Sequence, residues 1–361
     1  MSKIISFFMT IIMFLFPTLN VSKISVDKSE WKTDYAYVYC HGLSGWGSYD
    51  FQNHFMPYWG MFGGDMIKNL NKLGYKCYSA SVDPQGSAWD RACELYAQLM
   101  GTKVDYGKEH SERCGHDRFG TDYSKKRLIP DWSSKEKSNL LGHSFGGVTV
   151  RLLAELMANG SAQERKVTDK SEISELFTGG KADWIYSITT LAAPSNGTTA
   201  YGFGNPDEEV ENHDSAAYDM YIDNAMKINE KISTQKCTYY FAIPCSSTIK
   251  NEDGTYSADK ELTELIFRSS ANEMGSLTGV TPGGYVVDER WLENDGLVNT
   301  ISAKAPTSAP STTLDRNDIR AGIWNVAETY KGDHMAFNGD LFKPNNIRPF
   351  FADWMNMINS I

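Results

Sequence analysis

Short apolar runs alternate with helix-like segments along much of the chain. Five runs dense in Tyr, Val and Ile predict strands, because aromatic and β-branched residues favour extended structure and turn-forming residues bound each run. These runs cover residues 35–41, 75–82, 138–142, 184–191 and 238–243. Between them, apolar side chains recur at helical spacing over residues 65–73 and 147–157. Strands that alternate with helices predict a mostly parallel sheet covered on both faces, which is the α/β class.

Two long segments interrupt this alternation. Residues 83–126 are polar and contain histidines, and residues 196–236 begin with an acidic run before a helical pattern. Residues 303–313 are rich in Ala, Pro, Ser and Thr, which is typical of a surface loop. The chain shows no internal repeat and no clear domain boundary. We therefore expect one α/β domain over residues 23–361, with the two long segments as insertions.

The first 22 residues have the pattern of a secretory signal peptide. Lys3 precedes thirteen mostly apolar residues, 4–16, and a more polar stretch begins at Pro17. Thirteen residues are fewer than the about 20 that span a bilayer, so an uncleaved anchor is the weaker alternative. We predict a mature start between Val21 and Val26 and a secreted, extracellular protein.

Composition and charge narrow the class of partner. Of 361 residues, 41% are hydrophobic and 22% charged, which is ordinary for a globular protein. Lys plus Arg number 35 and Asp plus Glu number 45, giving a net charge of −10. Such a chain lacks the basic field that a phosphate backbone needs, so no nucleic-acid partner is expected. Six cysteines in a chain of this length do not indicate a disulfide framework, although the pair Cys93 and Cys114 stays open.

One pentapeptide carries the signature of a nucleophile. Residues 142–146 read GHSFG, a G-x-S-x-G motif placed between an apolar run and a helical pattern. That strand–turn–helix context favours Ser144 as a nucleophile over a plain glycine-rich turn. An oxyanion hole then needs the N–H of Phe145 and a second N–H from the loop after an early strand, where Leu43 is the candidate.

A serine nucleophile needs a general base, and the base needs an orienting acid. Two histidines follow Ser144 in the sequence, and His334 is the stronger candidate because His213 lies within the acidic run. Asp333 adjoins His334, but neighbouring side chains diverge, so it is a poor orienter. From the residues alone, the candidates for the acid remain Asp295, Asp315, Asp318 and Asp333.

Four blocks of sequence resemble a known family. The blocks are HGLSGWG at 41–47, WDRACELYAQL at 89–99, GHSFGG at 142–147 and RWLENDGLVNT at 290–300. Together they resemble the zinc-containing bacterial lipases of the Geobacillus and Staphylococcus type. The resemblance implies an α/β-hydrolase fold and hydrolysis of lipid esters. By matched position, the residues it assigns are Ser144 as nucleophile, Asp295 as acid, His334 as base, and Leu43 and Phe145 as the oxyanion hole.

The same resemblance implies a zinc site. Its ligands fall on Asp90, His110, His116 and Asp223, and two imidazoles with two carboxylates fill a tetrahedral shell, so the zinc would be structural. His110 and His116 are six residues apart, which does not stack them on one helix face, so we expect a loop to carry them. The alternative to a zinc site is that His110 and His116 are two exposed loop histidines without a ligand. Calcium is not expected, because Ala336 stands where the family pattern has an acid.

These expectations combine into a secreted serine ester hydrolase of lipase or carboxylesterase type. Its substrates are lipids or other esters, and the polyesters that some clostridial relatives hydrolyse are included. Residues 196–236 are expected to form a lid that covers the acyl site or meets a lipid interface. The alternative for its apolar side chains is ordinary core packing; they are Tyr201, Phe203, Tyr218, Met220, Tyr221, Ile222 and Met226. The alternatives are an esterase without interfacial activation, a hydrolase in which zinc activates water, and a non-catalytic surface-binding module of the same fold.

Overall fold

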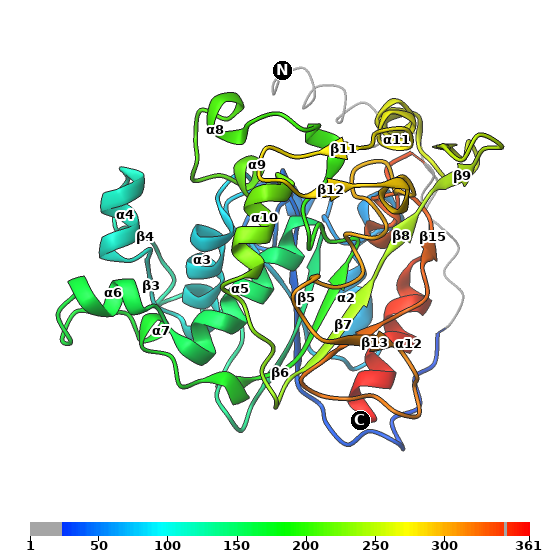
Figure 1. Ribbon diagram of the computed structural model, residues 1–361. Helices are drawn as coiled ribbons and strands as arrows, with labels where there is room; N and C mark the ends of the chain where they lie inside the picture. The colour runs from blue at the N-terminus through cyan, green and yellow to red at the C-terminus, as the bar shows by residue number, and fades with distance from the viewer. Residues whose placement is uncertain (1–23, 343–344) are drawn as a thin grey trace.

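A seven-stranded, entirely parallel sheet runs through the molecule (Figure 1). The computed structural model describes residues 24–342 and 345–361. In spatial order the strands are β13 (Ser311–Thr313), β14 (Trp324–Val326), β7 (Tyr239–Ile243), β6 (Ile185–Leu191), β5 (Ser138–His143), β1 (Ala36–Cys40) and β2 (Cys77–Ala80). The five predicted strands are confirmed. The predicted loop 303–313 is partly wrong, since its last three residues pair with β14 as the edge strand.

Alternation along β1 divides the core into two layers. Val38 and Cys40 face one buried cluster, and Tyr37 and Tyr39 face the other. Figure 1 shows the matching helices on opposite sides of the sheet. The first face is covered by α3 (Ala88–Met100), α5 (Phe145–Asn159) and α7 (Glu175–Thr178), and the second by α2 (Met66–Lys72) and α12 (Arg348–Asn359). The expected α/β-hydrolase arrangement, with helices on both faces of a parallel sheet, is therefore confirmed.

Smaller elements build the two predicted insertions and the C-terminal half. The remaining α-helices are α4 (Lys108–Cys114), α6 (Ala162–Val167), α8 (Pro206–Glu209), α9 (Ala216–Asp219), α10 (Ile222–Asn229) and α11 (Arg268–Met274). The strands outside the main sheet are β3 (Lys103–Asp105), β4 (Phe119–Asp122), β8 (Cys245–Ser246), β9 (Thr248–Lys250), β10 (Tyr256–Ala258), β11 (Gly279–Val280), β12 (Val286–Val287) and β15 (Tyr330–Lys331). The 3₁₀ turns are η1 (Phe51–His54), η2 (Met61–Gly63), η3 (Ala182–Trp184), η4 (Thr199–Tyr201), η5 (Leu265–Phe267), η6 (Glu289–Trp291) and η7 (Ala336–Asn338).

Three sequence expectations concern the chain ends and the thiols. The predicted signal peptide, residues 1–22, lies outside the described residues. Within the part of the chain that the structure describes, no helix combines the length and apolarity needed to cross a bilayer. All six cysteines are free thiols, so Cys93 and Cys114 are not bonded to each other.

Candidate active site and metal-ligand group

Ser144 stands on a sharp turn between β5 and α5. Its backbone has φ 53° and ψ −132°, a conformation that a residue other than glycine adopts only under strain. Glycines make the turn sterically possible. A Cβ on Gly142 would lie 2.3 Å from the Gly146 carbonyl oxygen, and one on Gly42 would lie 2.6 Å from the Ser144 Cβ. The strand, the helix and the loop after β1 therefore close tightly around the serine.

The structure brings together the three residues predicted as nucleophile, base and acid. The Ser144 hydroxyl lies 2.8 Å from His334 Nε2, and His334 Nδ1 lies 2.9 Å from Asp295 Oδ2. Ser144 is 7% exposed, His334 4% and Asp295 0%. The second carboxylate oxygen of Asp295 accepts the N–H groups of Leu297 and Val298, which fixes the orientation of the acid.

The competing candidates lie elsewhere. His213 is exposed and stacks on Tyr218. Asp333 accepts hydrogen bonds from the N–H groups of Glu264 and Met335, and burial raises its pKa to about 7. It therefore turns away from the His334 ring, as neighbouring side chains do. Two further rivals are exposed on the surface, Asp315 and Asp318.

The two proposed oxyanion donors adjoin the serine turn in sequence or in space, since Phe145 follows Ser144 and Leu43 follows Gly42, which lies against the Ser144 side chain. Phe145 is the first residue of α5, so its N–H has no acceptor within the helix. Leu43 packs against the small apolar cluster that contains Phe145. The loop that follows β1 and carries Leu43 is held in place by Arg91 of α3, whose guanidinium is fully buried. Arg91 donates to the carbonyls of His41 and Gly42, the latter at 3.4 Å.

His41 is a packed, fully buried residue of this loop. Its Nδ1 lies 2.8 Å from the Gly42 carbonyl, and its Nε2 accepts the Val82 N–H at 3.3 Å. Complete burial, followed by the nearby Arg91 charge, lowers the pKa of His41 to about 3. The ring is therefore neutral at neutral pH and shapes the loop.

A chain of hydrogen bonds, missed by the sequence analysis, joins the two loops of the site. His143 Nε2 donates to the His334 carbonyl at 2.8 Å, because a carbonyl can only accept. Its Nδ1 must then accept the Tyr58 hydroxyl at 2.7 Å, and that hydroxyl oxygen accepts the Gly42 N–H at 3.0 Å. Burial lowers the pKa of His143 well below its usual value, so the imidazole is neutral. The signal in the sequence was the histidine inside GHSFG.

A second cluster gathers the predicted metal ligands around α4. Asp90 Oδ1 lies 3.1 Å from His110 Nε2, and Asp214 Oδ2 lies 3.3 Å from the same nitrogen and 3.2 Å from His116 Nε2. His116 Nδ1 lies 2.9 Å from the Asp117 carbonyl, to which it donates, and its buried Nε2 forms no hydrogen bond. That nitrogen therefore directs a lone pair at the carboxylates, as a metal ligand does.

The electrostatics of this cluster favour a cation. Burial of His110 opposes its positive charge, yet hydrogen bonds to Asp214 and Asp90 raise its pKa to about 9. His110, Cys114, His116 and Asp214 each bring one donor atom within 4.8 Å of the others, so they form a group that can hold a metal ion. The residues present fit a divalent metal in their donor chemistry.

The predicted ligand Asp223 is wrong. It lies in the first turn of α10 and accepts hydrogen bonds from the Thr281 hydroxyl and the Gly283 N–H, so it anchors the β11–β12 hairpin. The carboxylate at the cluster is that of Asp214, which precedes α9, whereas the predicted Asp223 follows α9. The expected loop for both histidines is half right, because His110 is on α4 and His116 follows its end.

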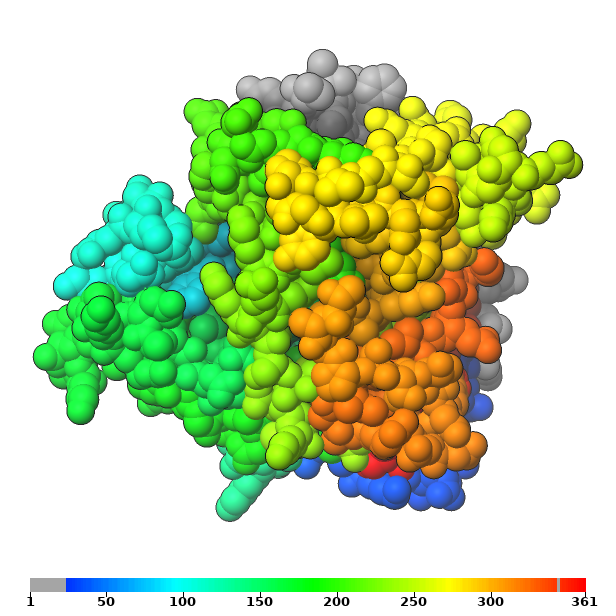
Figure 2. All heavy atoms as spheres, in the orientation of Figure 1, coloured from blue at the N-terminus to red at the C-terminus, as the bar shows by residue number. Residues whose placement is uncertain are grey.

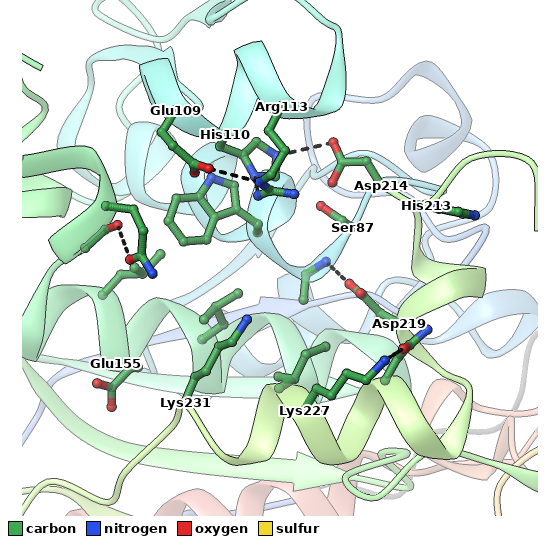
Figure 3. A pocket seen from close by; sticks show the side chains of 18 of the residues that line it. Ser87, Glu109, His110, Arg113, Glu155, His213, Asp214, Asp219, Lys227 and Lys231 are labelled. Carbon is green, nitrogen blue, oxygen red and sulfur yellow. Dashed lines mark hydrogen bonds and ion pairs between the residues drawn. The ribbon is translucent and has the colours of Figure 1, made fainter. Parts of the chain in front are cut away.

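A cavity of about 510 Å³ opens beside the metal-ligand group (Figure 3). His110 and Asp214 form one side, and Lys227 of α10 and Lys231, just after the end of that helix, lie across from them. Ser144 does not line this cavity. The cavity beside the metal-ligand group is therefore separate from the serine site.

Comparison with known proteins gives the family. The family described as "Lipase-like, C-terminal domain" matches residues 33–210 and 205–356. The chain belongs to this family. Lipase 2 of Staphylococcus aureus is 32% identical over 351 residues, which cover 84% of this chain and 50% of that protein. The lipase of Staphylococcus hyicus is 31% identical over 381 residues, 90% of this chain and 57% of that protein. The chain thus spans about half the length of the curated relatives it matches.

Solved structures agree with this assignment. EstA from Clostridium botulinum superposes with a TM-score of 0.83 at 26% identity, covering 97% of this chain and 93% of that chain. The Staphylococcus hyicus lipase superposes with a TM-score of 0.80 at 27% identity, covering 94% and 98%. The likeness therefore extends over almost the whole fold, including the segments that carry both clusters.

Proposed function

We propose that this protein is a serine ester hydrolase that cleaves carboxylic esters through an acyl-enzyme. The observation that carries the proposal is the continuous chain from the Ser144 hydroxyl through His334 to Asp295, with contacts of 2.8 and 2.9 Å, at a strained turn. Membership of the lipase family supports the same reaction. Lipids and simple esters are the proposed substrates, with polyesters included.

In the proposed mechanism the site residues have distinct roles. His334 Nε2 takes the hydroxyl proton as Ser144 attacks the ester carbonyl, and Asp295 holds the imidazole in the required tautomer. The N–H groups of Phe145 and Leu43 bind the developing oxyanion, and loss of one such donor typically costs about 10²–10³ in rate. His334 then protonates the leaving alcohol, and water hydrolyses the acyl-enzyme by the same route.

We propose that the metal-ligand group binds zinc in a structural role. Asp90, His110, His116 and Asp214 supply two carboxylate oxygens and two imidazole nitrogens, which fill a tetrahedral shell. A bound metal would tie the segment 83–126 to the segment 196–236. With all four coordination positions filled by protein atoms, no position would remain at which the metal could activate a water molecule.

We propose that residues 196–236 act as a lid over the serine site, and that the enzyme is secreted. Ser144 is 7% exposed, and the segment 196–236 packs beside the residues proposed for the oxyanion hole. Ala216 and Met220 from this segment pack in one cluster with Phe145 and Leu43. Movement of the segment would therefore expose both oxyanion residues together, and the predicted signal peptide would direct the enzyme out of the cell.

Kinetics on a chromogenic short-chain ester test the proposed function. Ser144→Ala should lower kcat by about 10⁴-fold or more, because the triad acts as one unit. Ser171→Ala, which removes a hydroxyl from an exposed turn, serves as the control and should keep the full rate. Thermal unfolding at the wild-type temperature would show that Ser144→Ala is folded. Retained turnover by folded Ser144→Ala would refute the proposal.

A further inference from the structure

One peptide group in the loop after β1 receives several hydrogen bonds at one end. The Gly42 carbonyl and the Leu43 N–H belong to this planar group and point in opposite directions. Three donors reach the carbonyl oxygen, namely the Gly45 N–H at 3.2 Å, His41 Nδ1 at 2.8 Å and Arg91 Nη1 at 3.4 Å. In the described part of the chain, no backbone carbonyl accepts the Leu43 N–H, which leaves it available to a substrate oxygen.

Arg91 is the charged donor of the three, and the oxygens that accept its N–H groups are all neutral. Besides the Gly42 carbonyl, its Nη1 reaches the Asp83 carbonyl at 2.9 Å, and its Nη2 donates to the His41 carbonyl. Its Nε donates to Thr149 Oγ1 at 3.0 Å. Because the guanidinium is fully buried, its charge polarises these dipoles more strongly than it would in water.

Arg91 also contacts the residue that supplies the other proposed donor. Its guanidinium carbon lies 5.3 Å from the centre of the Phe145 ring, within the range of a cation–π contact. Thr149 Oγ1, which accepts from Arg91, donates in turn to the Phe145 carbonyl at 3.2 Å. A single side chain of α3 therefore links the loop after β1 to the first turn of α5, the two segments proposed to supply the oxyanion N–H groups.

We propose that Arg91 is a positioning residue that sets the orientation and donor strength of the Leu43 N–H, an inference that rests on the serine mechanism proposed above. Hydrogen bonds to the Gly42 carbonyl draw electron density from the peptide group, so the N–H at its other end becomes a better donor. Such cooperative strengthening amounts to about 10–30% per bond. The same bonds fix the plane of the group, so the Leu43 N–H is aligned before the oxyanion forms.

A tetrahedral adduct of the full chain tests this role without turnover. A trifluoromethyl ketone adds reversibly to the Ser144 hydroxyl and mimics the tetrahedral intermediate. In that step the Oγ–carbon bond forms, the hydroxyl proton moves to His334, and the carbonyl oxygen becomes an oxyanion. Arg91→Gln should weaken binding of the ketone by about tenfold or more, because the Leu43 N–H is no longer held in line with that oxyanion.

The matched control is Arg151→Gln. Arg151 is also a buried guanidinium, but its N–H groups are bound to the Ser195 carbonyl and to Asn229, away from the loop after β1. This variant should keep the wild-type affinity for the ketone and the wild-type kcat. Thermal unfolding of both variants shows how much stability each has lost and confirms that the protein measured is folded.

Steady-state kinetics on the chromogenic ester give a second readout. Folded Arg91→Gln should lose about tenfold to a hundredfold in kcat and keep KM within about twofold, since misalignment affects the transition state more than the bound ester. The pH dependence of kcat/KM, which reports the base His334, should be unchanged. Arg91→Lys should recover part of the lost kcat, because it returns a charged donor to the same carbonyl oxygens.

The contrary results are distinct. Folded Arg91→Gln with wild-type ketone affinity and wild-type kcat would overturn this inference and leave the serine mechanism intact. Equal losses in Arg91→Gln and Arg151→Gln would assign Arg91 a merely structural role and also overturn it. If Arg91→Gln does not fold, Arg91→Lys should still bind the ketone more weakly than Arg151→Lys, and equal affinity would overturn the inference. A wild type that forms no adduct at all would refute the proposed mechanism itself.

Discussion

Replacement of Tyr58 by phenylalanine removes the hydroxyl that joins the two loops of the serine site. That hydroxyl accepts the Gly42 N–H at 3.0 Å and donates to His143 Nδ1 at 2.7 Å, and all three groups are buried. Each orphaned buried partner costs about 1–3 kcal/mol, so the free energy of unfolding should fall by about 2–6 kcal/mol. Because His143 also holds the His334 carbonyl, kcat should fall by about tenfold or more through loss of alignment.

Denaturant unfolding and steady-state kinetics of two variants measure these effects. Tyr39→Phe is the matched control, because Tyr39 is buried in the neighbouring core and its hydroxyl contacts the Met355 sulfur at 3.3 Å, a weak acceptor. It should lose less than about 1 kcal/mol and keep its kcat. If Tyr58→Phe unfolded at the same denaturant concentration as Tyr39→Phe, with unchanged kcat, the hydrogen-bond chain would not position the base.

Three further predictions concern the pH dependence of stability, the effect of metal removal and the contact with a lipid interface. Burial raises the pKa of Glu94 to about 7 from 4.5, so the native state binds the extra proton and stability should fall by up to about 3 kcal/mol as pH rises from about 4.5 to 7. Glu94→Gln should reduce this slope in denaturant titrations, with the buried Asp333 giving part of the remainder, and an unchanged slope would contradict the assignment. Removal of metal by a chelator should lower the unfolding temperature, and Zn²⁺ should restore it; no shift in calorimetry would argue against a structural ion. Leu265 and Ile266 are 76% and 53% exposed, so the pair Leu265→Ser and Ile266→Ser should reduce rates on emulsified long-chain esters while sparing soluble ones. The control Val167→Ser, at an exposed side chain outside this segment, should spare both, and equal loss on both substrates in the Leu265 and Ile266 variant would refute a lipid contact.

The sheet was predictable because its central strands are long enough to carry a pattern. The runs at β1, β6 and β7 are rich in aromatic and β-branched residues, and the short apolar run of β5 leads directly into the G-x-S-x-G turn. The edge strand β13 has only three residues in a segment rich in Ser, Thr and Pro, so nothing local separates it from a loop. Its pairing with β14 is a tertiary effect.

The serine site was more predictable than the metal site for a physical reason. Ser144 and Phe145 are part of a strand–turn–helix motif that can be recognised in the sequence, and few histidines compete with His334 for the role of base. The fourth metal position depends on which acid of residues 207–223 folds back towards α4. Asp214 does so, and Asp223 instead satisfies the hairpin at Thr281, a choice that only the packed structure reveals.

The apolar side chains of the segment 196–236 could form a lid face or pack in the core, and the sequence left both open. They are largely buried, including Met220, Tyr221, Ile222 and Met226. Exposed aliphatic side chains occur instead in the segment 249–286, which forms the protruding upper right of the molecule in Figure 2. Helical spacing identifies an apolar face but does not say whether that face meets solvent or the core.

Covalent labelling tests the central claim most directly. Reaction with a fluorophosphonate, followed by peptide mass spectrometry, should place one adduct on Ser144 and abolish ester hydrolysis in proportion to labelling. His334→Ala should react far more slowly, because the hydroxyl has lost its base. Full hydrolysis by unlabelled enzyme in the presence of the reagent, or an adduct on another residue, would contradict the proposed nucleophile.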